Sequence, residues 1–275
     1  MDGRETIAIE TADDPRIAEF RALRDRDLTG REGRFIAEGT VVLRMLAGAH
    51  AAGAFMAEKI LLLKNRVQGV ADILALFPPD IPVYVAESDV IDRIAGFHMH
   101  RGVLALGRPM GCEGLADRLD ALPETALVLV GCGISNHDNV GSMFRNAAAF
   151  GADVVLLDET CCDPLYRKAL RVSVGSVLSV PFSRQGAASD ILASLADRGF
   201  AIWSLSPRGS CDIREIPSAR RIALVVGTEG EGLPPEILSA FQSARIAQVP
   251  GLDSLNVATA TGIALYQIAA GMGRI

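Results

Sequence analysis

The chain has 275 residues, of which 49% are hydrophobic and 22% charged, and its formal net charge is −6 at pH 7. This length exceeds one average domain and suits two, and the hydrophobic fraction allows a large core. No run of 18 or more uncharged apolar residues occurs, so no membrane-spanning helix is predicted, and the acidic first residues do not have the form of a secretory signal or a transit peptide.

The first half of the chain alternates between strand and helix patterns. Residues 1–14 are polar and aperiodic, which predicts a tail, and a helix is expected to begin at Pro15. Beyond it we predict strands at 35–37, 59–63, 82–86 and 103–106, and helices at 40–52, 67–77 and 88–96. This rhythm predicts a small α/β/α domain over residues 15–108, followed by a linker at 109–123 that contains Pro and Gly.

The second half, residues 124–275, alternates more strongly. Its short runs of Val, Ile and Leu are typical of strands buried on both faces of a parallel sheet. We predict such strands at 126–130, 153–157, 177–180, 201–205, 222–226 and 245–249, with helices at 141–150, 165–172, 188–198, 235–243 and 255–271. The predicted fold class is therefore α/β, with a parallel sheet in the second domain.

Cysteine usage and charge limit the kinds of site. The five cysteines form no Cys-x-x-Cys pair and no Cys/His ligand spacing, so we expect no disulfide framework and no metal site, as fits a protein of the reducing cytoplasm. The acidic balance argues mildly against nucleic-acid binding, which usually needs a basic surface. Most of the positive charge is on arginine, the better bidentate phosphate ligand. Codon bias would produce the same excess of arginine over lysine, and we favour codon bias as its explanation.

The first motif, Asn139–Ala152, begins just past a predicted strand. Ligands of parallel α/β sheets bind beyond the carboxyl ends of the strands. We expect Asn139 in the loop and Arg145 on the first turns of the following helix, so that both border one cleft. A surface ion pair is the alternative for Arg145.

The second and third motifs follow two later strands. Gly227, Gly230 and Gly232 follow a buried strand, but their spacing is neither that of a P-loop nor Gly-x-Gly-x-x-Gly. The two acids of this loop would repel phosphate, so an uncharged or cationic ligand fits better. In the third motif, Ser254–Thr259, a Ser-x-Asn pair precedes an apolar helix, and a plain helix cap is the alternative reading.

Taken together, the ordered segments NVGSMFRNAAAFGA, VVGTEGEGL and VPGLDSLNVATA resemble motifs one, two and three of the SpoU (TrmH-like) RNA 2′-O-ribose methyltransferases of the SPOUT superfamily. The stretch Asp163–Ser176 is also similar to that family. A weaker similarity links the segments FIAEG at residue 35 and HRGVLA at residue 100 to the ends of the family's N-terminal RNA-binding domain, which has an α/β/α fold.

The resemblance implies a deep trefoil knot in the second domain, a site for S-adenosylmethionine inside it, and a homodimer. It implies catalytic roles for the matching motif residues, which are Asn139, Arg145, Glu229, Ser254 and Asn256. The cofactor-binding residues it implies are Val226, Gly227, Gly232, Val249, Pro250 and Leu255. The loop from Pro250 to Asp253 is shorter than the family's usual loop, which affects the expected shape of the cofactor site.

The expected reaction is transfer of a methyl group to a ribose 2′-oxygen, which needs no metal. Arginine is effectively always protonated, so we expect Arg145 to hold the adjacent phosphate and stabilise the developing alkoxide rather than to act as a base. Asn139, Ser254 and Asn256 would orient the loop and the ribose, and Glu229 would fix Arg145 or the loop backbone.

Three alternatives stay open at this level. An inactive knotted factor for RNA binding or assembly would keep the fold but not bind the cofactor. An ordinary nucleotide-binding α/β enzyme such as a dehydrogenase lacks its Gly-x-Gly-x-x-Gly fingerprint here. Ribosomal and transfer RNA are both substrates of the family, and the presence of an N-terminal domain favours ribosomal RNA.

Overall fold

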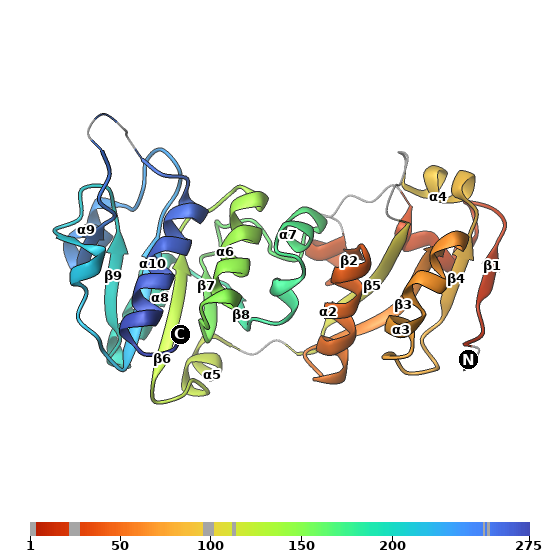
Figure 1. Cartoon of the computed structure of the whole chain (residues 1–275), viewed down its shortest axis with the longest axis horizontal. Helices are drawn as coiled ribbons and strands as arrows, with labels where there is room; N and C mark the ends of the chain where they lie inside the picture. The colour runs from red at the N-terminus through yellow and green to blue at the C-terminus, as the bar shows by residue number, and fades with distance from the viewer. Residues whose placement is uncertain (1–3, 22–27, 96–101, 112–113, 250, 252–253) are drawn as a thin grey trace. The chain divides into compact units, whose positions relative to one another are not determined.

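The computed structural model describes residues 4–21, 28–95, 102–111, 114–249, 251 and 254–275 (Figure 1). The chain divides into two units. The first unit contains residues 1–112 and 165–179, and the second contains residues 113–164 and 180–275. The segment Leu165–Ser179, which we predicted within the second domain, therefore groups with the first unit.

The first unit has a five-stranded mixed sheet in the order β1-β4-β3-β5-β2. Strand β4 pairs in parallel with β1 and β3, whereas β5 is antiparallel to β3 and β2. The bounds of these strands are β1 Ile7–Ile9, β2 Phe35–Glu38, β3 Phe55–Leu63, β4 Val83–Ala86 and β5 Val103–Pro109.

Helices flank this sheet. One core cluster lies between the sheet and the segments η1 and α4, and includes Ile17, Phe20 and Ile91. The helices are η1 Pro15–Phe20, η2 Leu28–Glu32, α2 Thr40–Ala51, η3 Lys64–Arg66, η4 Gln68–Val70, α3 Ala71–Leu74, α4 Ser88–Ala95, α7 Arg167–Val172 and η5 Ser176–Leu178. The single helix predicted at 67–77 is thus two short ones.

The predicted tail at residues 1–14 contains an ordered strand. Strand β1 pairs with β4 through Ile7 and Tyr84. The Arg4 guanidinium donates hydrogen bonds of 2.6–3.1 Å to four backbone carbonyls, those of Leu74, Phe77, Pro78 and Ile81. Burial lowers the pKa of Arg4, while Asp80 opposes that change. The sequence did not reveal this strand because an apolar alternation of three residues is too short to indicate one. The carbonyls that Arg4 binds lie about 70 residues further along the chain, so no local pattern marks them.

Turn geometry packs the segment after α7 onto the first unit. Gly175 has a φ of +82°, and a Cβ atom there would lie 2.7 Å from Met45 Cγ on α2. Only glycine allows this approach. Val177 and Leu178, which we predicted in a strand at 177–180, are instead buried in the 3₁₀ turn η5. That prediction is wrong because the apolar run is covered by a helix rather than by neighbouring strands.

The second unit has a seven-stranded sheet in which every pairing is parallel. The strand order is β10-β12-β9-β11-β6-β7-β8. The strands are β6 Ala126–Gly131, β7 Val154–Leu157, β8 Phe182–Arg184, β9 Ala201–Leu205, β10 Cys211–Asp212, β11 Arg221–Val226 and β12 Gln242–Arg245. The predicted α/β fold with a parallel sheet is confirmed.

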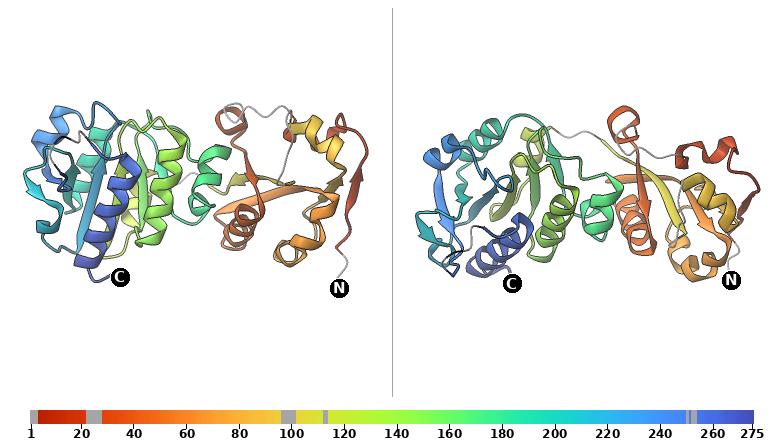
Figure 2. Two further views of the ribbon diagram at one scale, coloured as in Figure 1. Left: turned by 45° about the horizontal axis from the view of Figure 1, so that its top comes forward. Right: turned by 90° about the horizontal axis from the view of Figure 1, so that it is seen from above.

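Both faces of this sheet are covered, as Figure 2 shows. Helices α6 and α10 pack together on one face. On the other face, a core cluster joins side chains of α5, α8 and α9 to alternate strand residues such as Val128 and Val130. The helices of this unit are α5 Leu115–Asp120, α6 His137–Ala149, α8 Ala188–Asp197, η6 Ile213–Glu215, α9 Pro235–Ala240 and α10 Val257–Gly271.

The strand predicted at 245–249 is displaced in the structure. Strand β12 ends at Arg245 and pairs with β9 through Gln242 and Trp203. Polar residues form this strand because it lies near the edge of the sheet, so the apolar run that follows it misled the prediction. In the parts of the chain that the structure describes, no helix combines the length and the apolar character needed to cross a membrane.

Candidate functional site

Two loops carrying predicted motifs meet at the carboxyl edge of the parallel sheet. Strands β6 and β11 are neighbours, and their last paired residues are Gly131 and Val226. The loops that follow are in contact, because a Cβ atom on Gly133 would lie 2.8 Å from Thr228 Cγ2. Ligands of open parallel sheets bind at this edge.

Asn256 connects all three motif segments. Its Oδ1 accepts hydrogen bonds from the backbone N–H groups of Ala258 (3.0 Å) and Thr259 (3.2 Å), and so caps α10. Its Nδ2 donates to Asn139 Oδ1 at 2.9 Å and to Glu229 Oε1 at 2.6 Å. One amide therefore fixes the start of α10 and ties it to the first and second motifs.

The first motif begins inside a helix rather than in a loop. Asn136 is the N-cap of α6, and its side chain accepts a hydrogen bond from the backbone N–H of Asp138 at 2.9 Å. The helix therefore starts at His137, four residues before the predicted start, and Asn139 lies in its first turn. Asn139 is only 5% exposed. Because its Oδ1 accepts from Asn256, its Nδ2 donors remain available to a ligand.

The second motif forms a tight turn closed on itself. The backbone N–H of Gly232 donates to Thr228 O at 3.1 Å, and Thr228 Oγ1 donates to Gly232 O at 3.3 Å. A Cβ atom on Gly227 would lie 2.6 Å from backbone atoms of Gly232 and Leu233. No side chain fits there, so glycine is required at residue 227 for the turn to close.

Arg145 and Ser254 lie outside this hydrogen-bonded cluster. Arg145 is exposed on α6 and makes no hydrogen bond or ion pair with the residues that the structure describes. Glu229 was expected to fix either Arg145 or the loop backbone, and in the structure its Oε1 accepts from Asn256 Nδ2 instead. Ser254 is exposed, and Asn256 rather than Ser254 caps the helix.

The predicted cofactor residues differ in exposure. Val226 and Gly227 are buried, Gly232 and Leu255 are half-buried, and Val249 is 76% exposed. Pro250 lies outside the described residues. Next to Val249, the Gln248 Oε1 atom is buried and accepts no hydrogen bond from the described residues.

Asp158 braces the loop that leads into α6, a role that the sequence analysis missed. Its carboxylate accepts from the backbone N–H groups of Gly133, Thr160 and Cys161, each at 3.0 Å. The Thr160 hydroxyl donates a further bond of 2.7 Å to Asp158. An acidic residue directly after a buried strand was the available signal.

The described cysteines near this edge do not provide a nucleophile. Burial raises the pKa of the Cys132 thiol to about 12 and that of the Cys162 thiol to about 11, and the pKa of Cys161 is also raised by burial. A nucleophilic cysteine needs the opposite shift. Among the described residues, no group of three or more His, Cys, Asp or Glu side chains is placed to hold a metal ion.

Comparisons with known proteins identify the relatives of this chain. The profile of the SpoU rRNA Methylase family matches residues 126–266. A protein of Mycobacterium tuberculosis named as an uncharacterized tRNA/rRNA methyltransferase is 38% identical over 97% of the chain and 92% of the relative.

Two solved structures have the same fold over nearly the whole chain. The AdoMet-bound rRNA methyltransferase of Sinorhizobium meliloti superposes with a TM-score of 0.80 at 25% identity, covering 98% of each chain. The SpoU methyltransferase AviRb of Streptomyces viridochromogenes, solved with AdoMet, gives a TM-score of 0.81 at 20% identity and covers 95% of this chain and 100% of that chain. The second likeness shows the fold alone.

Proposed function

The chain belongs to the SpoU rRNA Methylase family and is an RNA methyltransferase, and from this premise we propose that it methylates the 2′-oxygen of a ribose in ribosomal RNA with S-adenosylmethionine. The observation that carries the proposal is the hydrogen-bonded cluster of Asn139, Glu229 and Asn256 at the carboxyl edge of the sheet. It joins the three motifs on which the resemblance depends.

The residues of this edge fit S-adenosylmethionine. When bound, this cofactor supplies a methyl group attached to a positively charged sulfur. The resemblance assigns Val249 to the cofactor site, and its exposed side chain would offer an apolar surface to the adenine ring. A Cβ atom added at Gly230 or Gly232 would meet no atom within 4 Å, so the backbone of this turn is open to a ligand at these two glycines.

Arg145 supplies the positive charge of the proposed site. Its guanidinium is exposed and carries no partner among the described residues, so it is available to hold the phosphate next to the reacting ribose. A fixed cation beside that oxygen stabilises the negative charge that develops on it. Arg145 does not itself remove the proton of the 2′-hydroxyl, because arginine stays protonated.

The amide cluster positions the reacting groups. Asn256 uses both of its amide atoms in hydrogen bonds within the protein, and its Nδ2 donates to Asn139 Oδ1. The Nδ2 donors of Asn139 therefore remain to orient the ribose. Glu229 stays beside Asn256 and fixes the turn after β11. Ser254, exposed before α10, would contact the ribose from the third motif. Holding reactants in line can contribute about 7–11 kcal/mol to a transfer reaction.

Ribosomal RNA is the proposed substrate, with transfer RNA as the alternative. The name of the SpoU rRNA Methylase family and the similar rRNA methyltransferase of Sinorhizobium meliloti support the first choice. Residues 15–108 would bind the RNA, and residues 124–275 would carry the reaction. The stretch at 109–123, which we predicted as a linker, includes α5, whose Leu119 lies in the core of the second unit. The proposal also places the enzyme in the cytoplasm, which agrees with its free cysteines.

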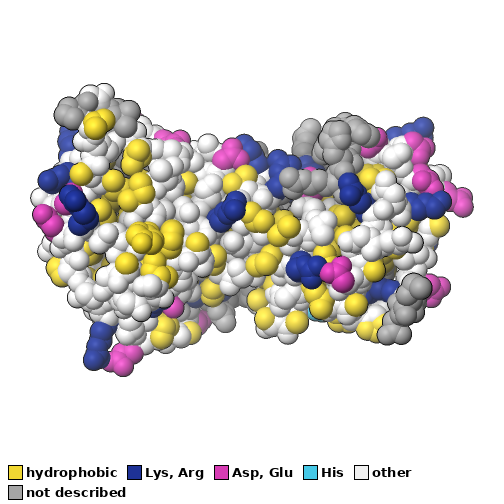
Figure 3. Space-filling view, viewed as in Figure 1, with side chains coloured by type: hydrophobic (Ala, Val, Ile, Leu, Met, Phe, Trp, Pro, Cys, Tyr) yellow, Lys and Arg dark blue, Asp and Glu magenta, His cyan; other side chains and the backbone are white. Residues whose placement is uncertain are grey.

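The proposal includes a homodimer formed through α6 and α10. Figure 3 shows hydrophobic side chains gathered over α10. Ile263 and Tyr266 on this helix are 41% and 56% exposed, and the Tyr266 ring packs on Phe150 at 5.7 Å between centroids. Light scattering should give twice the chain mass for the native protein, and the mass of one chain for Tyr266→Asp.

The proposal further includes a deep trefoil knot in the second unit. The resemblance is the ground for this knot, and the bond from Asn146 Nδ2 to Ala258 O, at 2.7 Å, shows only that α10 is held against α6. Pulling the chain by its two ends would test it. A knotted chain stops short of the roughly 3.3–3.6 Å per residue of a fully extended one, whereas full extension would contradict the knot.

A methylation assay with Arg145→Ala tests the proposed chemistry. The variant should bind S-adenosylmethionine in calorimetry as the native protein does, yet transfer no methyl group to ribosomal RNA. Arg208→Ala, an exposed arginine after β9, is the matched control and should keep full activity. Ribose methylation is read from resistance of the modified linkage to alkali. A wild-type rate in Arg145→Ala, or methyl groups on bases only, would refute the mechanism.

A further inference from the structure

A cavity of about 460 Å³ lies in the first unit, where β2 ends and α2 begins. Its lining includes Glu38, Thr40, Arg66 and Arg171, all of which belong to the first unit. Cavities of about 300–1,000 Å³ are typical of ligand sites. None of the residues proposed to bind cofactor or to take part in the reaction lines it.

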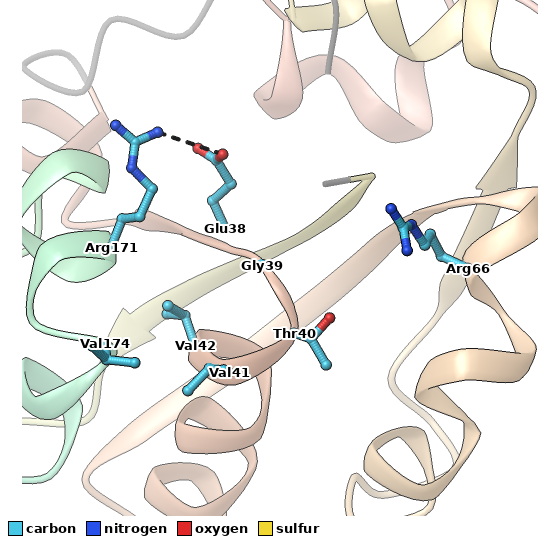
Figure 4. A pocket seen from close by; sticks show the side chains of 8 residues that line it. All are labelled: Glu38, Gly39, Thr40, Val41, Val42, Arg66, Arg171 and Val174. Carbon is cyan, nitrogen blue, oxygen red and sulfur yellow. Dashed lines mark ion pairs between the residues drawn. The ribbon is translucent and has the colours of Figure 1, made fainter. Parts of the chain in front are cut away.

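Two arginines from distant segments border the cavity. Arg66 comes from η3 and Arg171 from α7, and Figure 4 shows them on opposite sides of the turn at Gly39. Arg171 pairs with Glu38 at 3.6 Å, and Glu38 is only 7% exposed. The lining thus has two cationic groups and one anionic group. Guanidinium groups are suited to phosphate because their N–H donors form a fixed fork.

The start of α2 adds to this positive character. This twelve-residue helix has Gly39 as its N-cap, and no side chain caps its first turn. Thr40, Val41 and Val42, whose backbone N–H groups form that turn, all line the cavity. Uncapped N–H groups at a helix start favour an anion.

The surrounding chain concentrates basic charge in an otherwise acidic protein. The six residues of α7 include Arg167, Lys168 and Arg171 and no acid, whereas the whole chain has a net charge of −6. Val174, which also lines the cavity, has a φ of +54°. Positive φ is rare for a β-branched residue, and such strain gathers where a ligand is held.

We infer that this cavity binds a phosphate of the RNA backbone and so anchors the substrate at the first unit. The inference rests on the proposed function. The lining contains no aromatic side chain on which a base could stack, and base recognition in single strands relies on such stacking. The chemistry therefore fits a backbone phosphate rather than a free nucleotide.

Filter binding of protein-free bacterial ribosomal RNA over a range of salt concentrations tests the inference. Arg66→Ala and Arg171→Gln should each bind this RNA roughly tenfold more weakly, the loss of one charged hydrogen bond. The slope of log affinity against log salt should become shallower by about 1 for each variant. Arg44→Ala, an exposed arginine of α2 that does not line the cavity, is the matched control.

Glu38→Gln provides a test of opposite sign. It removes the anion from the lining and releases Arg171, so RNA should bind several-fold more tightly. A purely structural ion pair would give unchanged or weaker binding. Thermal unfolding and calorimetry with S-adenosylmethionine should match the native protein for Arg66→Ala, which shows that the variant is folded.

The outcomes separate the two proposals. If native protein binds ribosomal RNA but neither arginine variant changes the affinity or the salt slope, the cavity inference is wrong and the proposed function stands. If native protein binds S-adenosylmethionine but no RNA, both fail. If millimolar ADP binds in an Arg66-dependent way while RNA binding does not depend on Arg66, the cavity is a nucleotide site and the inference is overturned.

Discussion

Asn256 provides the sharpest test of the site, because its two amide atoms have separate roles. Its oxygen caps α10, and its nitrogen bridges to Asn139 and Glu229. Asn256→Ala removes both roles, whereas Asn256→Ser retains a capping oxygen and removes only the bridges. Comparing the two variants therefore separates the cap from the link between motifs.

The magnitudes follow from the hydrogen bonds. Loss of a cap costs about 1 kcal/mol. The bridge to the Glu229 carboxylate is charge-assisted but exposed, so we assign about 1 kcal/mol to it. The bridge to Asn139 is worth about 1 kcal/mol as well, because its loss leaves a buried oxygen unpaired. The expected loss of unfolding free energy is about 3 kcal/mol for Asn256→Ala and about 2 kcal/mol for Asn256→Ser.

Thermal unfolding followed by circular dichroism measures these differences. A change of 1 kcal/mol shifts the midpoint by about 2–4 °C in a domain of this size, so Asn256→Ala should unfold roughly 6–12 °C lower. Calorimetry should show weaker binding of S-adenosylmethionine to both variants. If Asn256→Ser unfolds and binds cofactor like the native protein, the bridges contribute nothing and our account of the site is wrong.

Three further perturbations test other parts of the structure. Gly227→Ala should cost about 1–3 kcal/mol or more and abolish cofactor binding in calorimetry, because its Cβ would meet the backbone of Gly232 at 2.6 Å; normal binding would contradict the closed turn. Arg274→Ala should lower the free energy of unfolding in urea by about 2 kcal/mol, since the guanidinium donates to Asp153 Oδ2 at 2.7 Å and to two backbone carbonyls. Burial raises the pKa of the Cys132 thiol from 9.0 to about 12, so iodoacetamide should not label it in native protein at pH 8.5. As the pH rises, the thiol ionises in the unfolded chain before it ionises in the folded one, so the contribution of Cys132 to the free energy of unfolding should fall between about pH 9 and pH 12. Rapid labelling of Cys132 in the native protein would contradict this raised pKa.

The sequence predicted the central sheet well because its strands are buried on both faces. The run at 126–130 coincides with β6 to within one residue, and 201–205 coincides with β9. A strand of this kind can be predicted from its own continuous apolar run, whichever strands lie beside it. The two-residue edge strand β10 was not predicted, and β12 beside it was predicted at displaced residues, because short polar strands near the edge of a sheet exist only through pairing.

The site was predictable in its residues but not in its contacts. A Ser-x-Asn pair before an apolar helix indicates a cap, and Asn256 is that cap. Its bonds to Asn139 and Glu229 join positions 117 and 27 residues away, which no local pattern encodes. The role of Asp158 was missed for a related reason, since its partners are mostly backbone N–H groups, which leave no mark in the sequence.

The grouping of Leu165–Ser179 with the first unit has a practical consequence for cutting the protein into parts. This segment is flanked on both sides by residues of the second unit, so no single cut separates the two. A fragment of residues 126–275 would lack α2 and β2, which pack against α7 and η5. In that fragment four side chains that are now buried would be exposed to water as an apolar surface that promotes aggregation: Ala169, Leu170, Val177 and Leu178. Studies of an isolated catalytic half should therefore begin by replacing them with polar residues.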